Sequence, residues 1–147
     1  MPADFRPKAM NTLHRSLLAI SGGRLGWHVG GMPALKMTTV GRTSGRPHTV
    51  MLTSPMREGV AIVIVASRGG DDRHPDWFLN LCEHPGVEVM FAGLPKQAMR
   101  ARVASSAERA TMWPQVIAAH EGYATYQSRT DREIPLVLLE PTRLRGG

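Results

Sequence analysis

The sequence has few cysteines, few aromatic residues and no long apolar run. Its 147 residues include one cysteine, Cys82, so an internal disulfide and a metal cluster held by several thiolates are excluded. The longest uninterrupted apolar run, Val60–Ala66, is far shorter than the roughly 20 residues that cross a membrane. The N-terminus also lacks the apolar stretch of a signal peptide. Together these absences predict a soluble, cytoplasmic protein.

The charge balance predicts an anionic partner. Lys and Arg number 18 against 12 Asp and Glu, which gives a formal net charge of +6. Nucleic acid is disfavoured, because aromatic residues make up only 5% and there is no lysine-rich run or recognition motif. The histidines show neither His-x-x-x-His spacing nor a cluster with acids, so no metal site is expected. A small molecule that carries phosphate or carboxylate groups is the stronger hypothesis.

Composition and length fit one compact domain with an N-terminal lead-in. Residues 1–33 hold a short apolar cluster at partly helical spacing, followed by a glycine-rich stretch that breaks regular structure. We therefore divide the chain into a flexible or helical lead-in at 1–33 and a domain at 34–147. Two interpretations stay open for the helix: packing on its own domain, or peripheral contact with an anionic membrane surface.

The remainder of the chain shows mainly the patterns of β-strands. Strands are predicted at Leu35–Val40, His48–Ser54, Val60–Ala66, Val87–Phe91, Gln97–Val103 and Ile134–Leu139. The first two and the fourth and fifth flank glycine-containing turns and are predicted hairpins. A further turn is expected at Pro55–Gly59. Because Val60–Ala66 is continuously apolar, we expect it to be buried on both faces and central in the sheet.

Two further helices are inserted among these strands. One begins near Pro75, carries an apolar stripe that includes Trp77, and ends before Pro85. The other opens with the capping-box spacing of Ser105 and Glu108 and runs to about His120. Helices inserted between hairpins, instead of alternating with strands, favour an α+β antiparallel barrel with about six strands and three helices.

Two loops and a tyrosine pair are candidates for chemistry. The turn Thr39–Arg46 combines glycines, hydroxyls and two guanidiniums that suit an anion, although, taken alone, it is better explained as a solvated hairpin turn. The stretch Ala66–Gly70 places a glycine pair at the exit of the buried strand, near a helix N-terminus. Tyr123 and Tyr126 would share a helix face. They either pack in the core or line a substrate site, and the surrounding glycine and charged residues favour a loop or lid.

Four blocks of residues follow one another between about residues 35 and 141. They are Thr39–Pro47, Ala66–Gly70, His74–Pro85, and Tyr123-x-x-Tyr126 followed by Asp131–Pro135. In this order they resemble the deazaflavin-dependent nitroreductase family of actinobacteria. The resemblance implies a split β-barrel of the FMN-binding type that binds coenzyme F420, an 8-hydroxy-5-deazaflavin. It also implies a cytoplasmic F420H2-dependent reductase that transfers hydride to a quinone, an activated alkene or a nitroaromatic compound.

The resemblance also implies site residues. The cofactor-binding set is Arg42, Thr43, Ser44, Arg46, His48, Ala66, Ser67, Arg68, Gly69, Gly70, Trp77 and Asn80. Around the substrate it places Ser67, Tyr123 and Tyr126, which orient it or relay a proton. The chain departs from the family where Thr43 replaces the usual lysine and His48 a frequent arginine. His120 stands where the nitroimidazole-activating members have a further tyrosine.

The expected partners are the anionic deazaflavin and a small electrophilic substrate, with the monomer and the dimer both open. Two other functions remain as alternatives. The same barrel could hold a flavin mononucleotide, although the Gly-Arg-x-Ser-Gly block at Gly41–Gly45 argues against it. The chain could also be a non-catalytic carrier of a cofactor or lipid-like ligand, because the sequence shows no obligatory catalytic acid.

Overall fold

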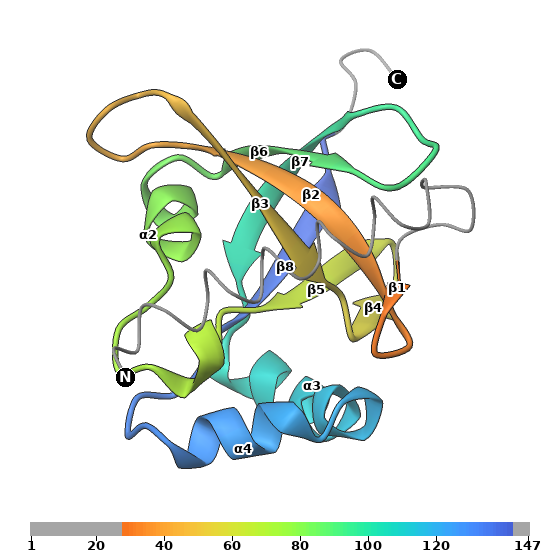
Figure 1. Ribbon diagram of the computed structural model, residues 1–147, viewed down its shortest axis with the longest axis vertical. Helices are drawn as coiled ribbons and strands as arrows, with labels where there is room; N and C mark the ends of the chain where they lie inside the picture. The colour runs from red at the N-terminus through yellow and green to blue at the C-terminus, as the bar shows by residue number, and fades with distance from the viewer. Residues whose placement is uncertain (1–27, 143–147) are drawn as a thin grey trace.

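The computed structural model describes residues 28–142, which form one curled β-sheet with helices at its ends (Figure 1). The strands are β1 (His28–Val29), β2 (Met32–Val40), β3 (Pro47–Thr53), β4 (Met56–Glu58), β5 (Ala61–Val65), β6 (Gly86–Met90), β7 (Gln97–Val103) and β8 (Leu136–Pro141). The helices are α2 (Asp76–Glu83), α3 (Ser106–Ala119) and α4 (Gly122–Ser128), with a 3₁₀ turn, η1, at Arg68–Gly70. None of the helices in this part of the chain is long and apolar enough to cross a membrane.

The sheet is antiparallel at every pairing. Its strand order is β1-β2-β6-β7-β8-β5-β4, and β3 pairs with β2 beside that path. The two predicted hairpins are confirmed as β2–β3 and β6–β7. The predicted central place of Val60–Ala66 is wrong, because β5 lies next to the terminal strand β4. That strand occupies most of the turn expected at Pro55–Gly59.

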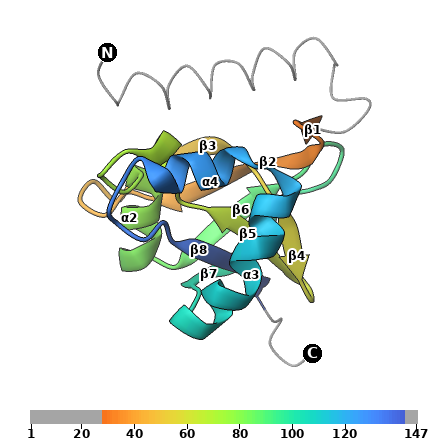
Figure 2. The same cartoon turned by 90° about the horizontal axis from the view of Figure 1, so that it is seen from below.

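Burial of β5 on both faces is confirmed and has a simple cause. Ile62 and Ile64 point into the core inside the curled sheet, which α2 closes at one end. Val63 and Val65 point the other way, into a second core with residues of α3 and α4. Figure 2 looks toward these two helices from below the view of Figure 1. A strand between two apolar layers has no polar face, so its sequence cannot reveal its position in the sheet.

Helix α4 corrects the expectation for the tyrosine pair. Tyr123 and Tyr126 lie on a helix, not in a loop or lid, and Tyr123 is buried in the core shared with α3. The helix carries no side-chain cap at Glu121, so the usual start signal is missing. The only described part of the expected lead-in, residues 28–33, forms β1 and the start of β2. Its predicted helix and membrane contact lie outside the described residues.

The predicted capping box at the start of α3 is present. The Glu108 N–H donates to Ser105 Oγ at 3.2 Å, and the Ser105 N–H donates to Glu108 Oε1 at 2.9 Å. Two further bonds come from the Arg102 guanidinium, at 2.8 and 3.0 Å from the carboxylate oxygens. The hydrogen bonds from Arg102 contribute most, and the one from the Ser105 backbone contributes next, to lowering the pKa of Glu108 to about 2. The carboxylate is therefore charged at neutral pH.

Substitution of the cap should destabilise the fold modestly. Ser105→Ala removes the acceptor for the Glu108 N–H, so we expect the free energy of unfolding to fall by about 1 kcal/mol. Urea denaturation would measure the loss. Ser106→Ala is the matched control, because the adjacent hydroxyl is exposed and caps nothing. Equal losses in the two variants would contradict a capping role for Ser105.

Candidate functional site

The turn between β2 and β3 is fastened to helix α2 through Arg42. The Arg42 backbone N–H and Nη1 both donate to Asn80 Oδ1, at 3.1 and 2.8 Å. Nη2 donates to Asp76 Oδ1 at 3.3 Å. Asn80 is itself buried, and its Nδ2 donates to the buried Thr39 Oγ1 at 3.2 Å. The first predicted block and the third are thus joined by one buried amide.

The turn holds its own shape through short-range bonds. The Gly41 N–H donates to Arg46 O at 2.8 Å, and the Arg46 N–H donates to Ser44 Oγ at 3.1 Å. Gly41 is buried, and a Cβ there would press on Ser44 Oγ and His48 Nε2, so a larger residue would require these two side chains to shift. Thr43, by contrast, is exposed. The turn therefore presents hydroxyl and guanidinium donors at the surface.

The second predicted block forms a left-handed loop at the exit of β5. Successive φ angles are +47° at Arg68, +64° at Gly69 and +86° at Gly70. A Cβ on Gly70 would lie 2.6 Å from the Tyr126 carbonyl oxygen, so the loop touches the backbone of α4. The Arg68 guanidinium pairs with the Asp71 carboxylate. The unusual backbone is thus enclosed by its neighbours.

Arg132 was absent from the predicted site residues, yet it crosses the back of this loop. Its guanidinium donates to the carbonyl oxygens of Asp71 at 2.8 Å, Ser67 at 2.9 Å and Ala66 at 3.2 Å. The sequence showed it only inside the Asp131–Pro135 block, with no role attached. The acceptors lie about 60 residues earlier in the chain, and no local pattern reports a contact at that separation.

A cleft of about 530 Å³ joins the two loops. It is lined by Arg42, Arg68, Asp72, Arg73, His74, Asp76 and Leu79. Three guanidiniums against two carboxylates make the lining net positive while His74 is neutral. Burial, and then the charge of Arg132, lower the pKa of His74. An anion is therefore the ligand that this cleft favours.

The tyrosines form an aromatic row at the α3–α4 junction. The ring of Tyr123 meets His120 and Tyr126 edge-on, with centroids 5.2 and 6.1 Å apart. A hydrogen bond of 3.3 Å joins the Tyr123 hydroxyl to Thr53 Oγ1 at the end of β3. Burial raises the pKa of Tyr123, so the phenol is neutral at physiological pH. Tyr126 is half-buried, so both rings contribute to packing.

The other predicted site residues differ in how far they are buried. Ala66 is fully buried and Trp77 is 8% exposed, so both side chains belong to the core under α2. Ser67 is half-buried at the start of the glycine loop. Within residues 28–142, no hydrogen bond joins its hydroxyl to either tyrosine. Of the predicted cofactor residues, Arg42 and Arg68 line the cleft, and none of the three predicted catalytic residues lines it.

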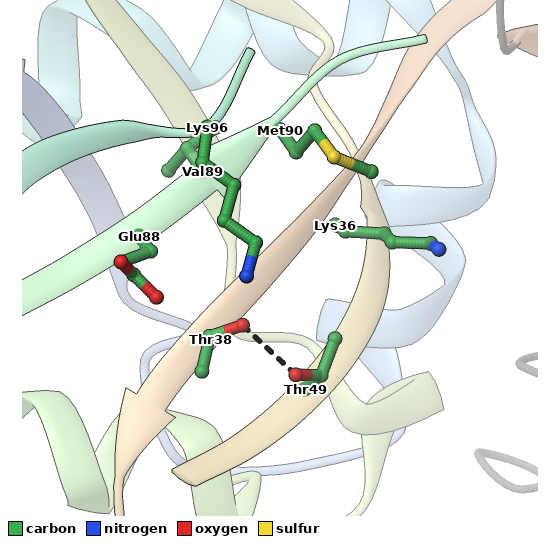
Figure 3. A pocket seen from close by; sticks show the side chains of 7 residues that line it. All are labelled: Lys36, Thr38, Thr49, Glu88, Val89, Met90 and Lys96. Carbon is green, nitrogen blue, oxygen red and sulfur yellow. Dashed lines mark hydrogen bonds between the residues drawn. The ribbon is translucent and has the colours of Figure 1, made fainter.

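A second hollow of about 200 Å³ lies on the outward face of β2, β3 and β6 (Figure 3). Thr38 and Thr49 form a hydrogen bond of 2.8 Å across its floor. The Lys96 side chain extends toward this pair, whereas Lys36 points away from it. Glu88 balances part of their charge. None of the predicted site residues lines this hollow.

Comparisons with known proteins show which family the chain resembles. The family model described as F420H(2)-dependent quinone reductase matches residues 12–141. An F420H(2)-dependent quinone reductase of Mycobacterium tuberculosis strain H37Rv is 36% identical over 132 residues, which cover 86% of this chain and 87% of that protein. A solved F420-H2 dependent reductase, FDR-A, is 36% identical with a TM-score of 0.62, and the match covers 74% of this chain and 94% of that one.

A second solved structure, described as a domain-swapped dimer, is also 36% identical with a TM-score of 0.62. The match covers 74% of this chain and 80% of that chain. These likenesses confirm the predicted split-barrel fold.

Proposed function

Because the chain belongs to the F420H(2)-dependent quinone reductase family, we propose that it reduces small electrophiles with coenzyme F420 bound along the arginine cleft. The resemblance predicted from the four blocks is confirmed, as are the cofactor it implies and the oxidoreductase class. We propose the finer assignments: a quinone as first substrate, with activated alkenes and nitroaromatics as further candidates.

The arginine cleft is the observation that supports this proposal. Coenzyme F420 carries a phosphate and an acidic tail, and guanidiniums bind such groups through charge-assisted hydrogen bonds. Arg42 and Arg68 reach the cleft from two separate predicted blocks. Among residues 28–142, the Arg42 guanidinium makes hydrogen bonds through Nη1 and Nη2 and none through Nε, so it retains donor capacity. The donor set thus fits the anionic part of the cofactor.

The chain itself would position the reactants and supply a proton. When bound, the reduced deazaflavin supplies a hydride, and the product anion then needs a proton. Ser67 begins the loop that borders the cleft, and we assign it to the edge of the deazaflavin ring. Tyr126, half-buried beside that loop, is the proposed contact with the substrate. Tyr123 keeps its proton and orients its neighbour through the aromatic row.

Titration of the purified full chain would test the cofactor assignment. We expect oxidised F420 to bind, as followed by its fluorescence, and flavin mononucleotide to bind at least tenfold more weakly. Steady-state assays with F420H2 should then show turnover of a naphthoquinone, an enone or a nitroaromatic compound. Preferred binding of flavin mononucleotide would favour the flavin alternative. Tight F420 binding without turnover of any substrate would favour a carrier.

Phenylalanine substitutions of the two tyrosines should distinguish a role in catalysis from a role in packing. Tyr126→Phe removes only a half-buried hydroxyl. We therefore expect kcat/KM for the quinone to fall roughly fivefold, which corresponds to about 1 kcal/mol of lost transition-state stabilisation. The affinity for F420 and the free energy of unfolding should stay unchanged. Tyr123→Phe also breaks the bond to Thr53, so its free energy of unfolding should fall by about 1 kcal/mol. Thr53→Val is the matched control for that bond. Wild-type kinetics for both tyrosine variants would return the pair to a packing role alone.

A further inference from the structure

The Arg132 side chain bonds to both ends of the loop at 66–74. Its Nη1 and Nη2 reach Ala66 O and Ser67 O, where β5 ends, and its Nε reaches Asp71 O. The same Nη1 lies 3.2 Å from His74 Nδ1, two residues before α2. A guanidinium only donates, so this imidazole nitrogen accepts. One planar group therefore fixes the entry, the middle and the exit of the loop.

The loop needs such an external restraint. Its backbone is left-handed at Arg68, a residue type that seldom adopts positive φ, and at the two glycines that follow. Inside the loop only two backbone bonds form, from the Gly70 N–H to Ser67 O and from the Asp71 N–H to Arg68 O. Glycine pairs also gain much freedom when released. Arg129 Nη1 donates to Gly69 O at 3.2 Å, and the Thr130 hydroxyl donates to Asp72 Oδ1 at 2.7 Å, but each of these bonds holds a single point inside the loop. Arg132 instead joins the strand end at Ala66 and Ser67 to Asp71 and His74.

The restraint matters to the cleft because the loop supplies most of its wall. Arg68, Asp72, Arg73 and His74 are four of the seven residues that line the cleft. Arg132 is not among the seven. It would therefore act through the residues that it holds, and not through the ligand.

We infer that Arg132 is a positioning residue that sets the loop at 66–74 in the conformation required to bind the anionic cofactor. This inference rests on the proposed function for the identity of the ligand. It predicts that affinity depends on the shape of the guanidinium and not on its charge alone, because a lysine ammonium cannot span three carbonyl oxygens in one plane. Arg132 would thus preorganise the binding site by holding the loop at 66–74, without lining the cleft itself.

Arg109 offers a matched control in the same neighbourhood. It is also a partly buried guanidinium, and its Nε donates to Ile134 O at 2.8 Å, close to Arg132 in the chain. Its Nη2 donates to Gln127 Oε1 at 3.0 Å, and the group stacks over Trp113. None of these bonds reaches the loop at 66–74. Gln127 also donates from Nε2 to the Arg132 carbonyl oxygen at 2.7 Å, so Arg109 is linked to the backbone of Arg132 and not to its guanidinium. Loss of Arg109 should therefore cost stability while the Arg132 guanidinium stays on the loop.

The experiment compares Arg132→Lys, Arg132→Met and Arg109→Lys in the full chain. We expect both Arg132 variants to bind oxidised F420 about tenfold more weakly than the wild type. Arg109→Lys should bind oxidised F420 with wild-type affinity, although its Tm should fall about as much as that of the Arg132 variants. In the free proteins, amide hydrogen exchange over residues 67–73 should accelerate only in the Arg132 variants. That measurement needs neither cofactor nor activity, and Arg132→Lys keeps a folded sample if the methionine variant unfolds.

The imidazole of His74 provides an independent reporter. The charged groups around it are Arg132 behind the loop and Arg42, Arg68, Asp72, Arg73 and Asp76 in the cleft. Because the positive charge of Arg132 helps to lower the pKa of His74, an NMR titration should show that pKa rising in Arg132→Met and staying low in Arg132→Lys. Weak binding in the lysine variant at an unchanged His74 pKa would separate shape from charge.

The outcomes are distinguishable from a failure of the proposed function. If the wild type does not bind F420, the proposed function is wrong, while the exchange data still test the restraint. If the wild type binds and Arg132→Lys binds equally well with wild-type exchange, the inference is overturned. A loss of affinity in Arg109→Lys as large as in Arg132→Lys would also overturn it, because it would reduce the effect to general destabilisation.

Discussion

Arg42→Ala is expected to weaken the binding of oxidised F420 ten- to a hundredfold, which corresponds to about 1.5 to 3 kcal/mol. Arg42 lines the cleft and combines a charge with donors that the bonds to Asn80 and Asp76 orient. Its side chain remains 35% exposed, so salt should screen part of the interaction. Fluorescence titration at low and high ionic strength would measure both effects, and the difference from the wild type should shrink in salt.

Asp76→Asn should strengthen F420 binding, whereas Arg42→Ala should weaken it. The Asp76 carboxylate is 86% exposed and competes with an incoming anion for Arg42 Nη2. Removal of its charge should strengthen F420 binding about two- to fivefold, as expected for a surface ion pair. Arg46→Ala provides a comparison in the same turn, since this exposed arginine does not line the cleft and should contribute less. If Asp76→Asn weakened binding as Arg42→Ala does, the carboxylate would instead be needed to orient the guanidinium.

The local parts of the fold could be predicted because their signals are local. Both hairpins carry glycine-containing turns between alternating strands, and α3 opens with a capping box whose two bonds are present. The short strands β1 and β4 escaped prediction because two or three residues carry no period, and only pairing with β2 and β5 makes them strands. Helix α4 escaped because its stability comes from the buried Tyr123 and not from a cap.

The candidate site was predictable as two loops but not as one cleft. Glycines and arginines near Arg42 and Arg68 marked both loops, since those residue types suit close approach to an anion. What joins them is tertiary: Asn80 bonds Arg42 across 38 residues, and Arg132 bonds Ala66 across 66 residues. Contacts between residues far apart in the sequence also determine the environment of Trp77. This residue is a predicted cofactor contact, but its side chain is buried in the core under α2. Residue type indicates what a side chain can do, whereas its partners decide what remains available.

Gly70→Ala is expected to destabilise the protein by about 2 to 5 kcal/mol and to impair F420 binding as well. The backbone has φ +86°, where an L-residue costs about 1 to 2 kcal/mol. The added Cβ would also lie 2.6 Å from the Tyr126 carbonyl oxygen and 3.0 Å from Arg129 Cβ. Because the first of these atoms is backbone, α4 or the loop must move, at a further cost of about 1 to 3 kcal/mol.

Gly69→Ala separates the two causes. Its φ of +64° is also left-handed, but a Cβ there would meet no atom within 4 Å, so only the conformational cost of about 1 to 2 kcal/mol applies. Urea denaturation of both variants would give the difference, and F420 titration would show whether a displaced loop misplaces Arg68. Equal losses of stability would mean that α4 yields freely to the new methyl group. In that case the close approach of Gly70 to Tyr126 would not be what sets the position of the cleft wall.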